Sequence, residues 1–258
     1  MSVITSRDNP RVKRWHALTR DARERRQERR AIIEGEHLVA ACLNSGWKIE
    51  ALILGKSAAA KFETFVSKAK TSVVLADAVF RAVSDTEAPT GIAAEIALPD
   101  STVDLRTANN CVFLEGIQDA GNVGTLLRSA AAFGIRHAVL GPGCADVWSP
   151  KVLRAGMGAH FAMAIEENAD LAKALARFGG KTACTLVRGG MPLHEADLSG
   201  RLGWIFGSEG QGLSDGVARL ATLKVTIPMP GSAESLNVAA AAAICLYEAA
   251  RRGGPGRT

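Results

Sequence analysis

Runs of apolar and β-branched residues alternate with segments of helical periodicity along most of the chain, and this alternation limits the fold more than any other feature. Apolar strands joined by helices are typical of a parallel sheet that is covered on both faces. The pattern therefore predicts an α/β fold. Composition agrees, because 47% of the residues are hydrophobic but only 5% are aromatic, which favours closely packed α/β layers over an aromatic-rich sandwich.

One polar stretch interrupts the alternation and divides the 258 residues into two parts. Residues 99–110 (PDSTVDLRTANN) contain a proline and have no sustained periodicity, so we interpret them as an interdomain linker. We expect a small α/β domain with a basic N-terminal arm over residues 1–98, and a second α/β domain over residues 111–258.

The expected elements follow from clusters of β-branched residues and from helical periodicity between turn signals. In the first domain we predict strands at 31–34, 49–54, 73–75 and 91–98, and helices at 36–44, 62–69 and 78–83, the last behind Asp77 as N-cap. In the second domain we predict strands at 111–117, 137–140, 163–165, 182–187, 202–206 and 224–227, and helices at 123–133, 171–178 and 236–252.

No stretch of the sequence has the length of a membrane span. The longest uncharged apolar run, Val238–Tyr247, is far too short to cross a bilayer. The N-terminus has no apolar segment and soon becomes basic, which argues against a secretory signal. We therefore expect a cytoplasmic protein that does not associate with a membrane.

The cysteines and histidines do not follow the spacing of a metal site or of a disulfide framework. The five cysteines are odd in number, widely separated and without a C-x-x-C pair, and the five histidines stand alone. We expect reduced, buried thiols, as in a cytosolic protein, and no metal.

Positive charge is concentrated near the N-terminus. Residues 7–30 contain ten Lys or Arg and four acidic residues, a balance of +6, whereas the whole chain carries +5, so the remainder is about −1. Such a stripe neutralises nucleic-acid phosphates and releases counterions. We assign contacts with nucleic-acid phosphates to Arg25, Arg26, Arg29 and Arg30. A solvated helix face is the alternative for the same charges.

The first of three segments that carry chemistry is residues 114–130 (LEGIQDAGNVGTLLRSA), which leave a predicted strand. Asn122 stands where it can cap the next helix, at the sheet edge where ligands bind in open α/β folds. Arg128 lies nearly two helical turns further on, so both side chains can lean toward the same rim. Taken alone, the segment also fits a capping asparagine and a surface arginine.

The second segment is residues 204–214 (WIFGSEGQGLS), a strand that runs into a turn with three glycines. Glycine lets the backbone turn sharply and approach a ligand closely. The spacing is neither the dinucleotide fingerprint nor a phosphate-binding loop. Glu209 can orient a substrate hydroxyl or a cofactor amino group, and an ordinary turn is the alternative.

The third segment is residues 227–238 (IPMPGSAESLNV), which precede an Ala-rich helix. Its prolines stop the strand and remove backbone donors, so the neighbouring backbone groups are free to bind an adenine edge. Ser235 and Asn237 stand at the start of the closing helix. Helix capping explains the serine, whereas asparagine inside a first turn is unfavourable unless its side chain is engaged.

In this order, the three segments resemble the signature motifs of the SpoU/TrmH family of RNA ribose 2′-O-methyltransferases, within the SPOUT superfamily. The matching patterns are N-x-G-x-x-x-R, G-S-E-G-x-G after an apolar strand, and I-P-M-x-G-x-x-x-S-L-N-V before the last helix. Residues 154–159 (RAGMGA) also resemble the intervening segment of the family. The resemblance covers residues 109–252.

The N-terminal part resembles the substrate-binding domain of the family, a small α/β module similar to certain ribosomal proteins. The resemblance lies in residues 30–39 (RAIIEGEHLV) and 89–92 (PTGI). The chain departs from the family at Thr90, where Gln is common, and at Gly156 and Ala239, where Ser is common. These departures concern RNA selectivity.

The resemblance implies a deep trefoil knot in the parallel-sheet domain and a homodimer whose sites are completed across the interface. It implies S-adenosylmethionine as cofactor, bent in the knot and held by backbone near Leu186, Gly207, Ile227, Met229 and Leu236. It also implies RNA as the substrate and an active site formed by Arg128, Asn122, Glu209, Ser235 and Asn237.

In the family, the arginine at the position of Arg128 is proposed to activate the ribose hydroxyl. A guanidinium group keeps its proton in proteins, so we expect Arg128 to stabilise the developing alkoxide and to anchor a phosphate. The other four residues of the predicted site would orient the ribose, the arginine and the cofactor.

We therefore predict methyl transfer to a ribose 2′-hydroxyl of RNA, and the added N-terminal domain favours ribosomal RNA. The alternatives are a tRNA ribose methyltransferase, a base-modifying enzyme of the same superfamily, and a non-catalytic RNA-binding protein of ribosome assembly. A dinucleotide-dependent dehydrogenase is disfavoured because its glycine fingerprint is absent.

Overall fold

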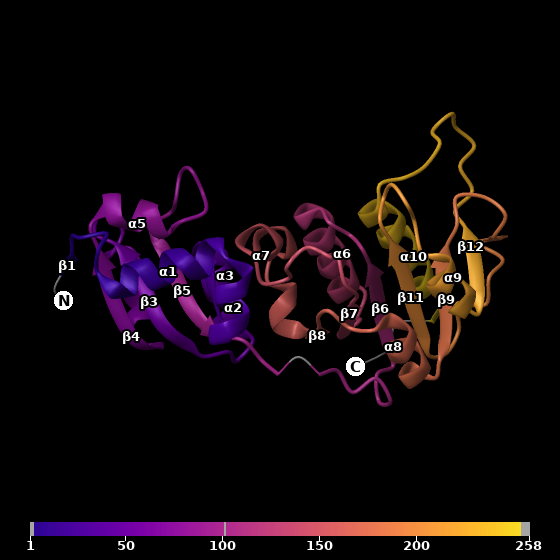
Figure 1. Cartoon of the computed structure of the whole chain (residues 1–258), viewed down its shortest axis with the longest axis horizontal. Helices are drawn as coiled ribbons and strands as arrows, with labels where there is room; N and C mark the ends of the chain where they lie inside the picture. Colours follow the sequence, from indigo (N-terminus) through magenta and orange to yellow (C-terminus); the bar gives the residue numbers. More distant parts are fainter. Residues whose placement is uncertain (1–2, 101, 254–258) are drawn as a thin grey trace. The chain divides into compact units, whose positions relative to one another are not determined.

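The computed structural model describes residues 3–100 and 102–253, which form two compact units (Figure 1). The first unit consists of the described residues up to Asp100 together with Trp148–Phe161, and the second consists of the remaining described residues. No helix among the described residues is long and apolar enough to cross a membrane.

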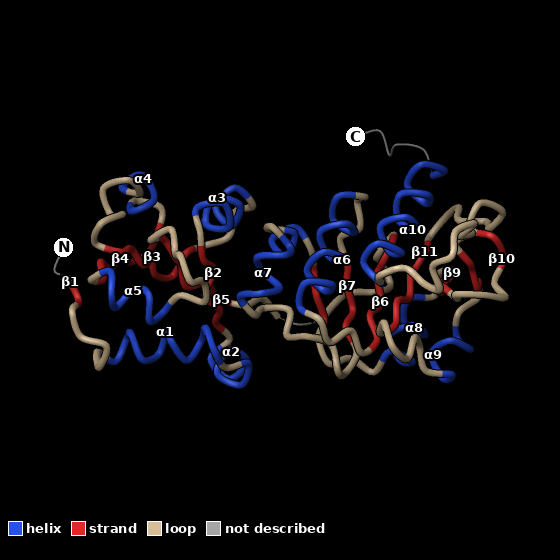
Figure 2. The backbone as a smooth tube through the Cα atoms, turned by 90° about the horizontal axis from the view of Figure 1, so that it is seen from above, coloured by secondary structure: helices blue, strands red, loops and turns tan. Residues whose placement is uncertain are grey.

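The first unit is built on a five-stranded mixed sheet with the strand order β1-β4-β3-β5-β2. β5 runs antiparallel to β2 and β3, and the other pairs are parallel. The elements are β1 (Val3–Ile4), α1 (Pro10–Arg20), α2 (Ala22–Glu28), β2 (Arg30–Glu34), α3 (Glu36–Asn44), β3 (Ile49–Gly55), α4 (Glu63–Val66), β4 (Ala69–Leu75), α5 (Asp77–Val83) and β5 (Ile92–Ala97). Helices α1, α2 and α5 lie on one side of this sheet, and α3 and α4 lie on the other (Figure 2).

The basic N-terminal segment folds into two helices. The Asn9 side chain caps α1, whose first residue is Pro10. Asp21 ends α1 and caps α2, and Arg29 ends α2 in a left-handed conformation (φ 54°). The apolar side of α1 packs into the core of the sheet through Val12, Trp15 and Leu18. The sequence predicted only a charged arm here, because the many charged residues obscure this short apolar stripe.

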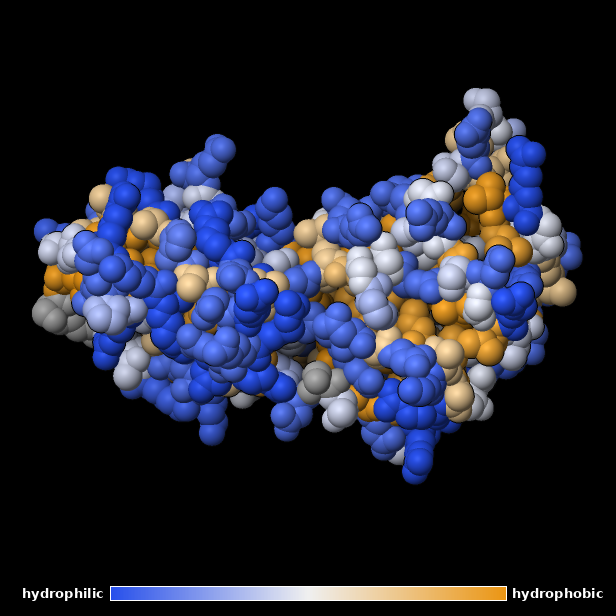
Figure 3. All heavy atoms as spheres, in the orientation of Figure 1, coloured by the Kyte–Doolittle hydropathy of each residue, from blue (hydrophilic) through white to orange (hydrophobic). Residues whose placement is uncertain are grey.

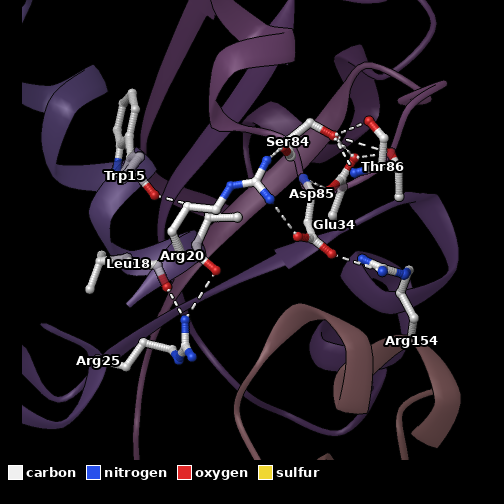
Figure 4. Close-up of polar contacts among 10 residues, drawn as sticks. Trp15, Leu18, Arg20, Arg25, Glu34, Ser84, Asp85, Thr86 and Arg154 are labelled. Carbon is white, nitrogen blue, oxygen red and sulfur yellow. Dashed lines mark hydrogen bonds and ion pairs between the residues drawn. The ribbon is translucent and has the colours of Figure 1, made fainter. Parts of the chain in front are cut away.

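Buried and half-buried carboxylates in the first unit are held by hydrogen bonds (Figure 4). Glu34 accepts hydrogen bonds from the Ser84 hydroxyl and from the backbone N–H of Asp85, the latter at 3.0 Å. The Asp85 carboxylate accepts from Arg20 at 2.9 Å and from Arg154 at 2.8 Å. These contacts tie the end of α1 and helix α7 (Pro150–Gly156) to the loop after α5.

Glu95 of β5 is the most deeply engaged of these carboxylates and is 6% exposed. It accepts two hydrogen bonds from Arg14 and one from Trp15 Nε1, each at 2.8 Å, and Arg30 Nε lies 3.5 Å away. Burial raises the pKa of this carboxyl, but the hydrogen bonds from Arg14 and Trp15 and the two arginine charges lower it below its usual value. Glu95 is therefore held ionised beneath α1.

The segment Trp148–Phe161 joins the first unit through an aromatic cluster. The Trp47 ring lies 5.9 Å from the Trp148 ring and 5.3 Å from the Phe161 ring, and Trp47 Nε1 donates to the Phe161 carbonyl at 3.2 Å. Gly158 has φ +91°, and a Cβ there would lie 2.8 Å from the Ala41 Cβ. Glycine therefore permits the turn between α7 and η1 (Ala159–Ala162) to approach α3 closely. The sequence predicted neither α7 nor η1.

The second unit contains a seven-stranded sheet with the order β10-β12-β9-β11-β6-β7-β8 and only parallel pairings. Helices α6 and α10 cover one face, and α8 and α9 cover the other (Figure 2). The elements are β6 (Asn110–Glu115), α6 (Ala120–Ala132), β7 (His137–Leu140), β8 (Ala164–Glu166), α8 (Leu171–Phe178), β9 (Lys181–Thr185), β10 (Met191–Pro192), β11 (Leu202–Gly207), α9 (Asp215–Leu220), β12 (Leu223–Thr226) and α10 (Val238–Gly253). The predicted α/β fold with a covered parallel sheet is confirmed, and the knot stays a prediction.

Part of the predicted linker belongs to the core of the second unit. Val103, Leu105 and Ala108 are buried there, and Arg201 Nε donates to the Ala108 carbonyl at 2.6 Å. The polar residues between these positions concealed the apolar ones, because three buried residues do not make a periodic pattern. The predicted domain limits stay a prediction.

Most predicted strands and helices are present, but two details are wrong. The helix expected at 62–69 is limited to α4, because Ala69 already pairs with Ile49 as the start of β4. Asp77 is not the N-cap of α5. It is the first helical residue, and its carboxylate accepts hydrogen bonds from the backbone N–H and the hydroxyl of Ser57.

Candidate functional site

The three sequence segments meet at one edge of the parallel sheet of the second unit. β6 and β11 are neighbouring strands, and Glu115 at the end of β6 lies opposite Gly207 at the end of β11. The loop that joins β12 to α10 extends well beyond the sheet (Figure 1). Because the strands are parallel, their carboxyl ends gather the three loops, as ligand sites of open α/β sheets require.

Side chains from the three segments form a hydrogen-bonded triangle. Glu209 Oε1 accepts from Asn122 Nδ2 at 2.8 Å and from Asn237 Nδ2 at 2.6 Å. Asn237 Nδ2 also donates to Asn122 Oδ1 at 2.9 Å. These residues are far apart in the sequence, so the triangle fixes the three loops relative to one another. We call Asn122, Glu209 and Asn237 the polar triangle.

Helix caps position two members of the polar triangle. Asp119 is the N-cap of α6 and accepts from the backbone N–H of Asn122 at 2.7 Å, so Asn122 is not the cap that the sequence suggested. Asn237 is instead a cap: its Oδ1 accepts from the backbone N–H groups of Ala239 and Ala240 at 2.9 and 3.1 Å. The Asn237 amide therefore starts α10 with its oxygen and binds Glu209 with its nitrogen.

A cavity of about 320 Å³, which we call the first cavity, lies beside the triangle. All five residues predicted to hold the cofactor line it: Leu186, Gly207, Ile227, Met229 and Leu236. The backbone groups of Ile227, Met229 and Leu236 make no hydrogen bond within the described residues. Polar backbone groups in a largely apolar wall are available to a ligand.

Gly207, in the wall of the first cavity, lies close against the backbone of Gly212. A Cβ at this position would lie 2.3 Å from the carbonyl carbon and oxygen of Gly212. The turn after β11 folds back through paired backbone hydrogen bonds between Ser208 and Gly212, at 3.1 and 2.9 Å. Glycine at 207 is therefore needed for the loop to close upon itself.

A second cavity of about 640 Å³ shares the loop Ser208–Leu213 with the first. Its other side is formed by residues 115–119 and Asn122, and Glu209 lines both cavities. The polar triangle therefore stands where the two cavities meet. This arrangement can place one ligand on each side of the same three side chains.

Arg128 and Ser235 are the predicted site residues outside the triangle. Arg128 is exposed on α6, lines neither cavity, and makes no hydrogen bond or ion pair with the described residues. Ser235 is exposed and lines the first cavity. The structure therefore gathers four of the five predicted catalytic residues around the cavities and leaves the guanidinium of the fifth unpaired.

The arginines predicted to bind RNA have different surroundings in the first unit. Arg25 is 4% exposed and donates to the Leu18 and Thr19 carbonyls at 2.6 and 3.1 Å, so its guanidinium stabilises the fold. Arg26 is exposed without a partner among the described residues.

The two remaining arginines of that set are partly engaged. Arg29 is 43% exposed and pairs with Asp100, and Arg30 is 31% exposed and lies near Glu95. The side of the first unit that carries α1 and α2 is mostly hydrophilic (Figure 3). Arg25 is thus engaged within the fold, and the assignment of RNA contacts to the four arginines stays a prediction.

The structure shows the state of the cysteines and the grouping of possible metal ligands. All five cysteines are free, and burial raises the pKa of both Cys42 and Cys245 to about 12. Such thiols are inert at neutral pH. Among the described residues there is no group of three or more His, Cys, Asp or Glu side chains that could hold a metal ion.

Comparison with known proteins adds family models for both parts of the chain. Residues 109–247 match the SpoU rRNA methylase family, and residues 9–94 match the MRM3-like substrate-binding domain.

Relatives match along nearly the whole chain. The Bacillus subtilis 23S rRNA (guanosine(2553)-2′-O)-methyltransferase RlmP is 35% identical over 96% of this chain and 98% of its own length. The Streptomyces viridochromogenes 23S rRNA (uridine(2479)-2′-O)-methyltransferase is 28% identical over 99% of this chain and 94% of its own.

A solved structure is similar over the same extent. The AdoMet-bound rRNA methyltransferase from Sinorhizobium meliloti is 28% identical and superposes with a TM-score of 0.84, over 97% of this chain and 98% of that one. The family model covers more than half of the chain, and the resemblance read from the three motifs agrees with it. The chain belongs to the SpoU rRNA methylase family.

Proposed function

We propose that this protein transfers the methyl group of S-adenosylmethionine to a ribose 2′-hydroxyl of ribosomal RNA. The observation that carries the proposal is the polar triangle between two cavities, in a chain of the SpoU family. One cavity suits a cofactor and the other a nucleotide, and the side chains between them belong to the three family motifs. Both relatives described above are named 23S rRNA 2′-O-methyltransferases.

The first cavity fits S-adenosylmethionine. Its volume of about 320 Å³ is in the range of small-molecule sites. Leu186, Ile227 and Leu236 provide apolar contact, and the free backbone groups of Ile227, Met229 and Leu236 provide polar contact for an adenine edge and for the amino acid part. When bound, the sulfonium of the cofactor supplies an electrophilic methyl group. A solved S. meliloti relative contains this cofactor.

The polar triangle holds the acceptor ribose. Glu209 receives two amide hydrogen bonds on one oxygen, so its other oxygen remains able to accept a hydrogen bond from a ribose hydroxyl. Asn122 and Asn237 fix the position of this carboxylate. In-line alignment of a hydroxyl with a methyl donor is the main contribution that such positioning makes to rate.

Arg128 stabilises charge and does not remove the proton. Its guanidinium stays protonated and is not neutralised by any described acidic side chain. It is therefore available to a phosphate of the RNA and to the oxygen that becomes negative during transfer. Ser235, exposed at the first cavity, orients the cofactor or the ribose.

A homodimer is part of the proposal. On α10, Ile244 is 40% exposed and Tyr247 is 55% exposed, although both are apolar or aromatic. The Tyr247 ring packs against Phe133 of α6, with 6.0 Å between centroids. A second copy that covers these helices would bury this surface. Tyr247→Asp should convert the dimer to monomer in light scattering, whereas a wild-type monomer contradicts this part of the proposal.

The test of the enzyme function uses the full chain, labelled S-adenosylmethionine, and rRNA and tRNA from cells that lack the protein. We expect label in rRNA at one linkage that resists alkaline cleavage, since methylation removes the 2′-hydroxyl that attacks the phosphate. Label in tRNA alone, or an alkali-labile product, would replace the proposal with one of the related methyltransferase activities. The proposal places the protein in the cytoplasm, with the ribosomes.

A further inference from the structure

We infer that the second cavity holds the base of the target nucleotide, and that the side-chain amides of Gln118 and Gln211 select that base. This inference rests on the proposed methyl transfer and adds a determinant of substrate specificity to it. Both glutamines line the second cavity, and Gln211 also lines the first.

The wall that the two cavities share indicates which part of the nucleotide the second cavity holds. Glu209 lines both cavities, and the loop Ser208–Leu213 separates them. A ribose held by the polar triangle while its hydroxyl faces the first cavity has its base on the opposite side of this loop. The second cavity, at about 640 Å³, is large enough for a base that is turned out of its stack.

Charge excludes a phosphate from the second cavity. Glu115, Asp119 and Glu209 line it, and no Lys or Arg does. A phosphate placed there would be repelled by the carboxylates, whereas a neutral base would not. The phosphates therefore lie outside the second cavity.

The three carboxylates of the second cavity each accept hydrogen bonds from the protein. Glu115 accepts from the Ser214 backbone N–H and hydroxyl at 2.8 and 2.7 Å. Asp119 accepts from the Asn122 N–H, and Glu209 accepts from the other members of the polar triangle. These hydrogen bonds hold the three carboxylates in the wall, and the second oxygen of Glu209 is kept for the ribose hydroxyl. We therefore assign base selection to other groups.

The two glutamine amides are the remaining polar side chains that suit a base edge. Gln118 and Gln211 are exposed, and neither side chain makes a hydrogen bond within the described residues. Gln211 is held through its backbone N–H, which donates to the Ser208 hydroxyl at 3.3 Å. Each amide offers one acceptor and one NH₂ donor, the combination that reads the edge of an unpaired base.

The experiment uses an rRNA fragment that the wild-type protein methylates, with the mapped nucleotide changed to each of the other three bases. Wild type, Gln118→Ala, Gln211→Ala and the double variant are compared by kcat/KM on the four RNAs. Gln27→Ala, which changes an exposed glutamine on α2, is the matched control.

We expect wild type to prefer the native base by at least 10-fold, and the double variant to reduce this preference to less than threefold by slowing the native RNA most. Equal rates of wild type on all four bases, or a uniform loss in the glutamine variants, would overturn the inference. Absence of methylation of any RNA by wild type would instead refute the proposed function. Calorimetry measures S-adenosylmethionine binding by Gln118→Ala. If this binding is retained, the loss of kcat/KM in the variant arises from its contact with the nucleotide.

Discussion

Particular polar side chains of the two units have contrasting surroundings. In the first unit, Arg14, Arg20 and Arg25 are bound by carboxylates or carbonyls that hold helices on the sheet. In the second unit, Arg128 and the two cavity glutamines have exposed polar groups without partners among the described residues. A charged residue is therefore a candidate for function when it has no hydrogen-bond or ion-pair partner within the fold. The number of charges in a segment does not by itself show which residues bind a ligand.

The largest effect should come from breaking the polar network of the first unit. Glu95→Ala removes the acceptor of Arg14 and Trp15 Nε1. Removing one partner of a buried pair costs about 3–5 kcal/mol, and we expect about 3 kcal/mol because Arg14 is 38% exposed and can partly rehydrate. Urea unfolding followed by tryptophan fluorescence measures this, since Trp15, Trp47 and Trp148 belong to the first unit.

Glu95 also makes the stability of the first unit depend on pH, which the second unit does not share through this residue. The pKa of Glu95 is lower in the folded state than in the unfolded state, so its stabilisation is present above the unfolded pKa and is lost as pH falls through the folded pKa. Between about pH 5 and pH 3, wild type should lose more stability of the first unit than Glu95→Gln does. Parallel pH curves for the two proteins would show that Glu95 does not carry this linkage.

The second prediction concerns Arg128, the unpaired cation of the second unit that we place at the reaction. Arg128→Ala should reduce kcat/KM for rRNA methylation by about 100-fold or more, about 2.7 kcal/mol, because a charge that stabilises the transition state is lost. Stability and S-adenosylmethionine affinity should stay at the wild-type level, since Arg128 has no partner within the described chain and lines neither cavity. Arg219→Ala, an exposed arginine on α9, is the control. Activity within threefold of wild type would exclude Arg128 from the centre of the reaction.

The third prediction divides the two roles of Asn237. Asn237→Ala removes both the cap of α10 and the donor to Glu209, and should cost about 1 kcal/mol of stability together with most activity. Asn237→Ser keeps a capping oxygen but has no amide donor. It should therefore be nearly as stable as wild type by thermal unfolding and yet as inactive as Asn237→Ala. If the serine variant is active, the triangle is a structural contact only.

Sequence periodicity predicted the sheet of the second unit because its strands are apolar on both faces, and the motifs identified the residues that meet at its edge. It did not predict α1 and α2, whose apolar residues are few among many charges, or the burial of Val103 and Leu105 in the supposed linker. These depend on contacts between residues far apart in the chain, which no local pattern records.

The sequence also could not show which residues cap α6 and α10 at the site. Asp119 and Asn122 both suit an N-cap, and the helix start that decides between them is fixed by tertiary packing. Gln118 and Gln211 gave no signal, because an exposed glutamine next to a motif is unremarkable until a cavity is seen beside it.

The smallest effect should distinguish a free arginine from a bound one on the same helix. Arg26→Gln, on an exposed position of α2, should lower the slope of log affinity for rRNA against log salt by about 0.7–0.9, the value for one lost phosphate contact. Arg25→Gln should leave this slope unchanged and reduce stability instead, because the buried guanidinium donates to carbonyls that would lose their partner. Filter binding at several salt concentrations measures both slopes. Suppose that Arg26→Gln and Arg25→Gln change the slope of log affinity against log salt equally. Burial then does not decide which arginines contact the RNA, and the comparison of bound and unpaired arginines is contradicted.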